Sequence, residues 1–106
     1  PLRPGDHPLM STLHVLSHSP FGDDRLSSCL RVIGGADALL LSGDAVYALQ
    51  PGTSPFTALH SRQIKLFVLA EDAQARALQV PDWAEVIDYP AFVELSIHHD
   101  KVNSWL

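Results

Sequence analysis

The sequence has one cysteine, one methionine, and only seven lysine and arginine residues against twelve aspartates and glutamates. One cysteine cannot form an intrachain disulfide, which suits a reducing cytoplasm, and it cannot build a thiolate zinc site. The basic residues form no run, so direct nucleic-acid binding, which needs phosphate neutralisation, is not expected. No apolar run approaches the roughly 20 residues of a membrane helix. The composition therefore predicts a cytoplasmic protein without a membrane span.

A chain of 106 residues, 46% of them apolar, is the size of one domain with a substantial core. Residues 1–9 contain three prolines and a glycine and lack the apolar segment of a signal peptide. We interpret residues 1–9 as a disordered extension or cloning remnant, and residues 10–106 as the folded domain, with Met10 as the natural start.

The segment from Leu13 to Ile33 reads as a strand, a turn and a helix. The apolar residues Leu26, Cys29, Leu30 and Ile33 recur at helical spacing. An aspartate pair at 23–24 supplies acceptors at the start of this helix, and the glycine pair at 34–35 is expected to end it in a left-handed conformation.

Three further strands are expected at 36–43, 64–70 and 85–89. Helical segments are expected at 44–49, 56–61, from 71 onward, and from 91 to about 98. This alternation predicts an α/β fold: a single four-stranded, mostly parallel sheet with helices on both faces. A flavodoxin-like strand order, 2-1-3-4, is the simplest arrangement. No strand is predicted after residue 98.

No strong catalytic or metal-binding motif is present. Cys29 is the first candidate, with two readings: a nucleophile or persulfide carrier, or a small buried apolar residue in the helix stripe. His98 and His99 are adjacent on a helix, so their side chains diverge by about 100° and do not suit one metal ion. His14 lies inside the first strand and is expected to be hydrogen-bonded in the interior. No metal or cofactor is expected.

Polar residues follow each predicted strand and should meet at the carboxyl edge of the sheet, where open α/β proteins bind ligands. Most of them also suit helix capping, so the two interpretations coexist. The loop after the first strand and the end of the chain hold exposed-type residues suited to line a site or contact a partner. These candidates are His18, Ser19, Pro20, Phe21, Trp105 and Leu106. The alternative for Trp105 and Leu106 is packing on their own core.

Several segments, taken in order, resemble the TusB/DsrH family of sulfur-relay proteins. They are MSTLHVLSHSPF at 10–21, LSSCL at 26–30, GADALLL at 35–41, VLAED at 68–72, the pairs at 88–89 and 92–93, and SWL at 104–106. The resemblance spans residues 10–106 and implies a DsrE-like α/β fold. Cys29 matches a cysteine of DsrH-type members that some TusB-type members lack, which makes the persulfide and core readings equal.

The resemblance also implies partners. Family members assemble with homologous TusC-like and TusD-like (or DsrF and DsrE) subunits into a dimer of heterotrimers, in which the main sulfur-carrying cysteine belongs to TusD or DsrE. TusBCD complexes pass persulfide sulfur towards 2-thiolation of the tRNA wobble uridine. The chain is expected to be a structural or relay subunit of this kind, not catalytic alone, which forms homodimers when its partners are missing. The alternatives are a DsrH-like subunit of dissimilatory sulfur oxidation, and a self-sufficient persulfide sulfurtransferase that uses Cys29.

Overall fold

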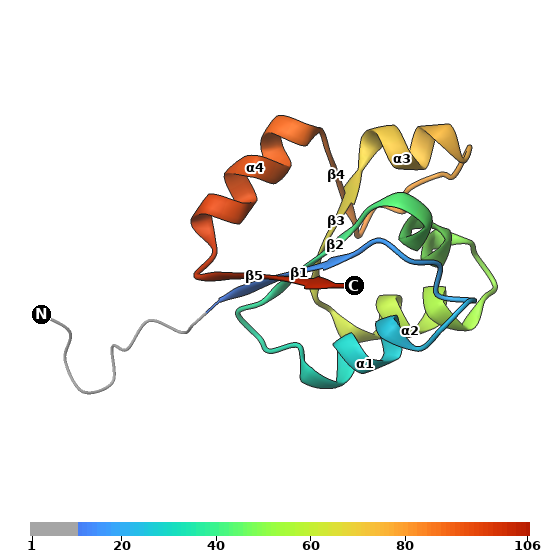
Figure 1. Cartoon of the computed structure of the whole chain (residues 1–106). Coiled ribbons are helices and arrows are strands. Elements are labelled where there is room, and N and C mark those ends of the chain that lie inside the picture. Colours follow the sequence, from blue (N-terminus) through green and yellow to red (C-terminus); the bar gives the residue numbers. More distant parts are fainter. Residues whose placement is uncertain (1–10) are drawn as a thin grey trace, which may run out of the picture.

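The computed structural model describes residues 11–106, so the interpretation of residues 1–9 and of Met10 lies outside the described part. A central parallel sheet runs through the molecule, with helical segments on both faces (Figure 1). Among residues 11–106, no helix is long and apolar enough to cross a membrane. In chain order the elements are β1 (Thr12–Leu16), α1 (Arg25–Val32), β2 (Ala38–Leu41), the 3₁₀ helix η1 (Gly43–Leu49), α2 (Ser54–Arg62), β3 (Lys65–Leu69), α3 (Ala70–Ala75), β4 (Glu85–Ile87), α4 (Tyr89–His98) and β5 (Lys101–Trp105).

The α/β class, the parallel sheet and the helices on both faces are confirmed, but the strand count and order are wrong. The sheet has five strands in the order β4-β3-β2-β1-β5. The fifth strand is the tail, whose residues Lys101 to Trp105 pair in parallel with Thr12 to Leu16. Three of the five residues in its sequence, KVNSW, are polar. The segment therefore lacks the apolar pattern of a buried strand. It forms because β1 offers it an open edge.

The strand order also explains the layers. The chain steps outward from β1 through β2 and β3 to β4, and then returns to the other side of β1 to form β5. Crossovers between parallel strands are right-handed, so a connection that moves in the opposite direction must lie on the opposite face of the sheet. Accordingly α4 lies on one side of the sheet, and α1 and α2 lie on the other (Figure 1).

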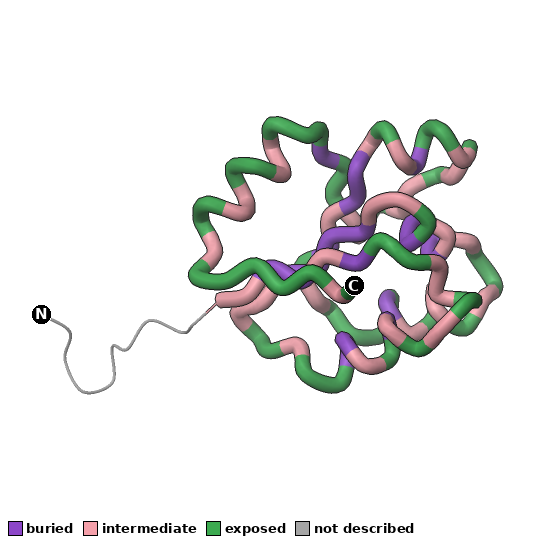
Figure 2. The backbone as a smooth tube through the Cα atoms, in the orientation of Figure 1, coloured by how far each residue is buried: buried purple, intermediate pink, exposed green. Residues whose placement is uncertain are grey.

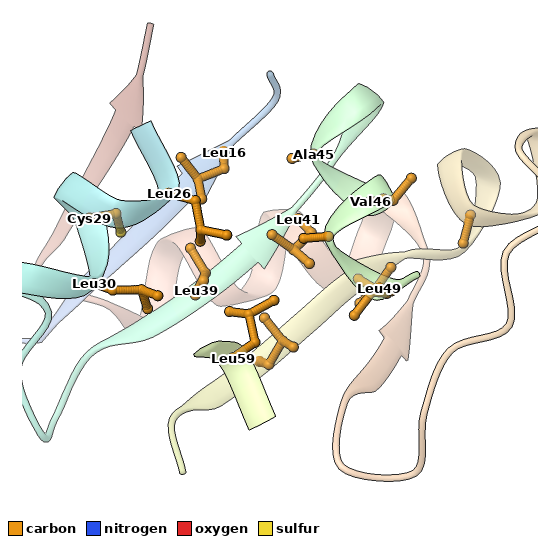
Figure 3. Close-up of a cluster of buried hydrophobic side chains, with 14 residues drawn as sticks. Leu16, Leu26, Cys29, Leu30, Leu39, Leu41, Ala45, Val46, Leu49 and Leu59 are labelled. Carbon is orange, nitrogen blue, oxygen red and sulfur yellow. The ribbon is translucent and has the colours of Figure 1, made fainter. Parts of the chain in front are cut away.

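The larger core lies between one face of the sheet and the layer formed by α1, η1, α2 and α3. Leu26, Cys29 and Leu30 of α1 point towards the leucines of β1 and β2, next to side chains from η1 and α2 (Figure 3). The predicted stripe of α1 is therefore confirmed. All four residues of β2 are buried, as expected for a central parallel strand (Figure 2).

The smaller core lies between the sheet and α4. It contains Leu13, Ala38, Leu40, Leu69 and Ile87, with Val15 and Phe67 of the sheet and Ala91, Phe92 and Leu95 of α4 packed against it. No residue of α4 is itself buried. On this face α4 is the helix that packs against the sheet, and it covers the face only in part.

Two local predictions have mixed outcomes. Asp23 accepts a hydrogen bond from the backbone N–H of Arg25, as expected of an acidic residue at the start of α1, whereas Asp24 makes no capping bond. The left-handed glycine at the end of α1 is wrong: α1 ends at Ile33 in extended conformation. The reason is Asp37, whose carboxylate accepts the backbone N–H of Gly34 at 2.8 Å and turns the chain there.

Candidate functional site

Cys29 lies on the inner side of α1 and has no exposed surface. Burial raises the pKa of its thiol to about 12, and the nearby Asp37 carboxylate adds to the rise, while Arg62 opposes it. A thiol with such a pKa is thiolate in only about one molecule in 10⁵ at neutral pH. In this conformation Cys29 packs as an apolar core residue.

A buried network joins His14 of β1, Asp37 of the loop before β2, and Trp105 of β5. The indole N–H of Trp105 donates to Nδ1 of His14 at 3.1 Å. Because Nδ1 accepts, the neutral imidazole carries its proton on Nε2, which donates to Asp37 Oδ2 at 3.2 Å. His14 is 4% exposed and is the buried polar residue of the described core. The prediction of a hydrogen-bonded interior histidine is confirmed.

Asp37 is the centre of this network. Its Oδ1 accepts the backbone N–H of Thr12 at 2.9 Å, and its Oδ2 accepts both Gly34 N–H and the ring of His14. Burial disfavours the charged carboxylate, but the hydrogen bonds from Gly34, Thr12 and His14 outweigh this cost and hold the pKa of Asp37 below its usual value. The carboxylate thereby links the start of β1 to the end of α1 through hydrogen bonds to both segments.

The loop after β1 presents Phe21 to solvent, next to the half-buried Pro20. The backbone N–H of Phe21 donates to the Ser19 hydroxyl at 3.2 Å, and the backbone N–H of Gly22 donates to the Ser19 carbonyl at 3.2 Å, so Ser19 shapes the turn. Beside it lies a groove of about 350 Å³. Its lining comes from this loop, α1 and the start of α2: Pro20, Phe21, Leu26, Ser27, Leu30, Ser54, Pro55 and Ala58. Such a lining suits an apolar side chain of a partner.

The polar residues at the carboxyl edge of the sheet bind mainly backbone groups and Arg76. Asp72 accepts the backbone N–H of Gly43 at 2.8 Å, and Arg76 donates twice to Asp44, at 2.9 and 3.1 Å. Gly43 has a φ of +50°, and a Cβ there would lie 3.1 Å from the Ser17 carbonyl, so glycine is needed. Within residues 11–106 no group of three or more potential metal ligands occurs.

Comparison with known proteins decides the family. The family model described as "DsrH like protein" matches residues 18–102, which is most of the chain. The chain belongs to the DsrH family. Curated proteins named Protein TusB are 39% identical in Erwinia tasmaniensis, 38% in Yersinia enterocolitica and 39% in Enterobacter sp.. Each of these alignments covers 88% of this chain and 99% of the relative. The sequence-based family assignment is confirmed.

The fold of this DsrH-family chain also has a solved counterpart. The crystal structure of the ychN protein from E. coli superposes with a TM-score of 0.73, covering 91% of this chain and 99% of the other. The two sequences are only 18% identical, so this likeness concerns the fold alone.

The structure brings together only some of the predicted site residues. Pro20 and Phe21 share the groove, with Ser19 supporting them and His18 exposed nearby. Trp105 lies elsewhere, half-buried on its own core, as the alternative reading proposed, while Leu106 is exposed. Their roles in partner contacts stay predictions.

The sequence reading missed Asp37, which it treated only as part of a strand. One signal was available: an aspartate between two alanines, just after a glycine pair, interrupts an apolar strand start. This signal did not reveal that Asp37 would bind His14 of β1.

Proposed function

We propose that this DsrH-family chain is a TusB-like subunit of a heteromeric sulfur relay. It acts with TusC-like and TusD-like subunits to pass persulfide sulfur towards 2-thiolation of the tRNA wobble uridine. Its contribution is structural, or that of an accessory relay subunit, and it is not catalytic alone. The proposal includes a cytoplasmic location and leaves contact with tRNA to other subunits, in keeping with the net charge of −5. The likeness to proteins named TusB over 88% of the chain supports it.

The observation that carries the accessory role is the burial of the only cysteine. A persulfide carrier needs an accessible thiolate, and Cys29 has neither an exposed surface nor a low pKa. The main sulfur-carrying cysteine is therefore expected on a partner subunit. The exposed Phe21 and its groove supply an apolar surface of the kind that partner subunits bury.

Co-expression with the two homologous subunits tests the proposal. The three chains should co-purify, and the complex should restore tRNA 2-thiolation in cells that lack the native genes. Cys29→Ala should retain most of this activity, whereas the equivalent change at the sulfur-carrying cysteine of the TusD-like partner should abolish it. Failure of the chain to co-purify with either subunit would contradict the proposal.

A second candidate is a self-sufficient sulfurtransferase that uses Cys29, which is the only thiol of the chain. It predicts that the purified chain takes up a sulfur atom from a persulfide donor at neutral pH, seen as added mass on intact protein. It also predicts complete loss of thiolation in Cys29→Ala.

A third candidate is a DsrH-like subunit in dissimilatory sulfur oxidation, favoured by the match to the DsrH family model. Neighbouring genes for dissimilatory sulfite reductase would support it. In that case loss of the gene would impair sulfur oxidation and leave tRNA thiolation intact.

A further inference from the structure

The edge strand β5 is attached differently at its two ends. Four of its five residues are exposed, and Trp105 is half-buried. At the start of the strand, the backbone N–H of Lys101 donates to the Ser11 carbonyl at 3.1 Å, and the Asp100 carboxylate accepts the N–H of Ser11 at 2.9 Å. At its end, Trp105 packs against the larger core and its indole N–H donates to Nδ1 of His14 at 3.1 Å. The attachment at the end therefore depends on one histidine.

The bond between Trp105 and His14 exists in only one protonation state of the imidazole. An indole N–H can donate but cannot accept, and a neutral imidazole accepts at one ring nitrogen. Asp37 binds the proton on Nε2 of His14 and so selects the tautomer that accepts at Nδ1. A protonated imidazole donates at both nitrogens and has no acceptor in any orientation of the ring. Trp105 can therefore bind neutral His14 but not protonated His14.

We propose that Trp105 and His14 form a proton-controlled latch, in which protonation of His14 releases the indole and frees the end of β5. A proton from solvent binds Nδ1, the proton on Nε2 stays between the ring and Asp37, and the indole N–H turns towards water. Because Trp105 is only half-buried, this movement does not require the core to unfold. The bonds between Ser11, Asp100 and Lys101 are unaffected, so the start of β5 stays in place. The latch thus links a charge in the core to the shape of one edge of the sheet.

Asp37 makes the protonated state accessible to a buried histidine. Its carboxylate lies 3.2 Å from Nε2 of His14 and is the charged group in contact with the ring. The strand neighbours of His14 in register, Leu39 of β2 and Asn103 of β5, are uncharged. Because its hydrogen bonds hold the pKa of Asp37 below its usual value, this carboxylate stays anionic between about pH 5 and 8, the range in which histidines titrate. It therefore compensates a positive charge on His14 throughout that range.

The helices on this face place no other titrating group next to the network in the same pH range. Cys29 of α1 lies near Asp37, and its thiol, with a pKa of about 12, stays protonated. Arg62 of α2 lies near Cys29 and keeps its positive charge. Helix α4 packs on the opposite face of the sheet. Protonation of His14 is therefore the charge change of this network between about pH 5 and 8.

The first test follows the indole N–H of Trp105 by NMR in the full chain. Trp83→Phe leaves Trp105 as the only tryptophan and removes the stacked pair of Trp83 and His60, whose own titration would disturb the signal. Between about pH 8 and pH 5.5, protection of the Trp105 indole from solvent exchange should fall at least about fivefold, whereas protection of the Lys101 amide should not change. The control adds His14→Asn, whose side-chain oxygen replaces Nδ1 with an acceptor that does not titrate. An equal fall in the control, or no fall without it, would overturn the proposal.

The second test leaves His14 in place and uses the reciprocity of linked equilibria. If the indole binds only neutral His14, its removal must make protonation of His14 easier. In Trp105→Phe, the Cε1–H resonance of His14 should therefore titrate at a pH about 0.5–1 unit higher than in the wild type. The matched control is Trp83→Phe, which removes an indole next to a different histidine, His60, and should leave the titration of His14 unchanged. An unchanged or lower titration pH in Trp105→Phe would show that no latch exists.

Discussion

Replacing Asp37 with alanine should destabilise the fold more than any surface substitution. The side chain is 12% exposed and accepts three hydrogen bonds, from Thr12 N–H, Gly34 N–H and His14 Nε2. Alanine leaves these three donors without their acceptor, and water can replace it readily only at the exposed Gly34, because Thr12 is half-buried and His14 is buried. A hydrogen bond to a charged group contributes about 1.5–3 kcal/mol, and its buried partner pays a desolvation cost when the bond is lost.

Because the three bonds share one carboxylate, their contributions do not simply add, and we expect a loss of about 3 kcal/mol. For a domain of this size the loss corresponds to a fall of about 12–24 °C in Tm. Urea denaturation followed by circular dichroism measures the free energy of unfolding. The control is Asp82→Ala, which removes the same charge from an exposed loop residue and should change stability by less than about 0.5 kcal/mol. A loss below about 1 kcal/mol in Asp37→Ala, or equal losses in the two variants, would refute the reasoning.

Three further results are expected. The lowered pKa of Asp37 stabilises the fold above the pKa of an unfolded aspartate, near 3.9, and this contribution disappears as the pH falls through the lower folded value. The stability advantage of the wild type over Asp37→Asn should therefore be full at pH 7 and shrink below about pH 4; a constant advantage would contradict this account. Because Cys29 is buried and protonated, a small alkylating reagent should modify it slowly at pH 7 and rapidly in denaturant, as followed by intact mass. Fast modification of the native chain would instead show a reachable thiolate. Trp105→Phe, which keeps an aromatic ring but removes the donor to His14, should cost about 1 kcal/mol in urea denaturation, and His14→Phe in the same background should add less than it does in the wild type. Fully additive losses would mean that the two side chains are not coupled.

Local patterns were sufficient for most elements. The stripe of Leu26, Cys29 and Leu30 predicted the buried side of α1, and the apolar run of 38–41 predicted a strand with both faces covered. A polar residue that follows a predicted strand was expected to suit helix capping, and Asp88, before α4, accepts the N–H of Ala91 at 2.9 Å. In these cases the information lies within one turn of helix or one strand.

Strand order could not be obtained in the same way. Sequential alternation of strands and helices is compatible with several orders, and the choice depends on which edge each crossover reaches. The strand β5 is recognisable only next to β1, because its residues Lys101 and Asn103 are polar and exposed and give no apolar pattern.

By itself, the sequence determined the α/β class, the helix α1 that holds Cys29, and membership of the DsrH family. These follow from periodicity, composition and ordered local segments. Only the tertiary structure revealed the fifth strand and the burial of Cys29, which raises the pKa of its thiol to about 12. It also revealed the hydrogen-bond network of His14, Asp37 and Trp105. Those depend on residues up to 91 positions apart, whose proximity arises from strand pairing and packing that no local pattern contains.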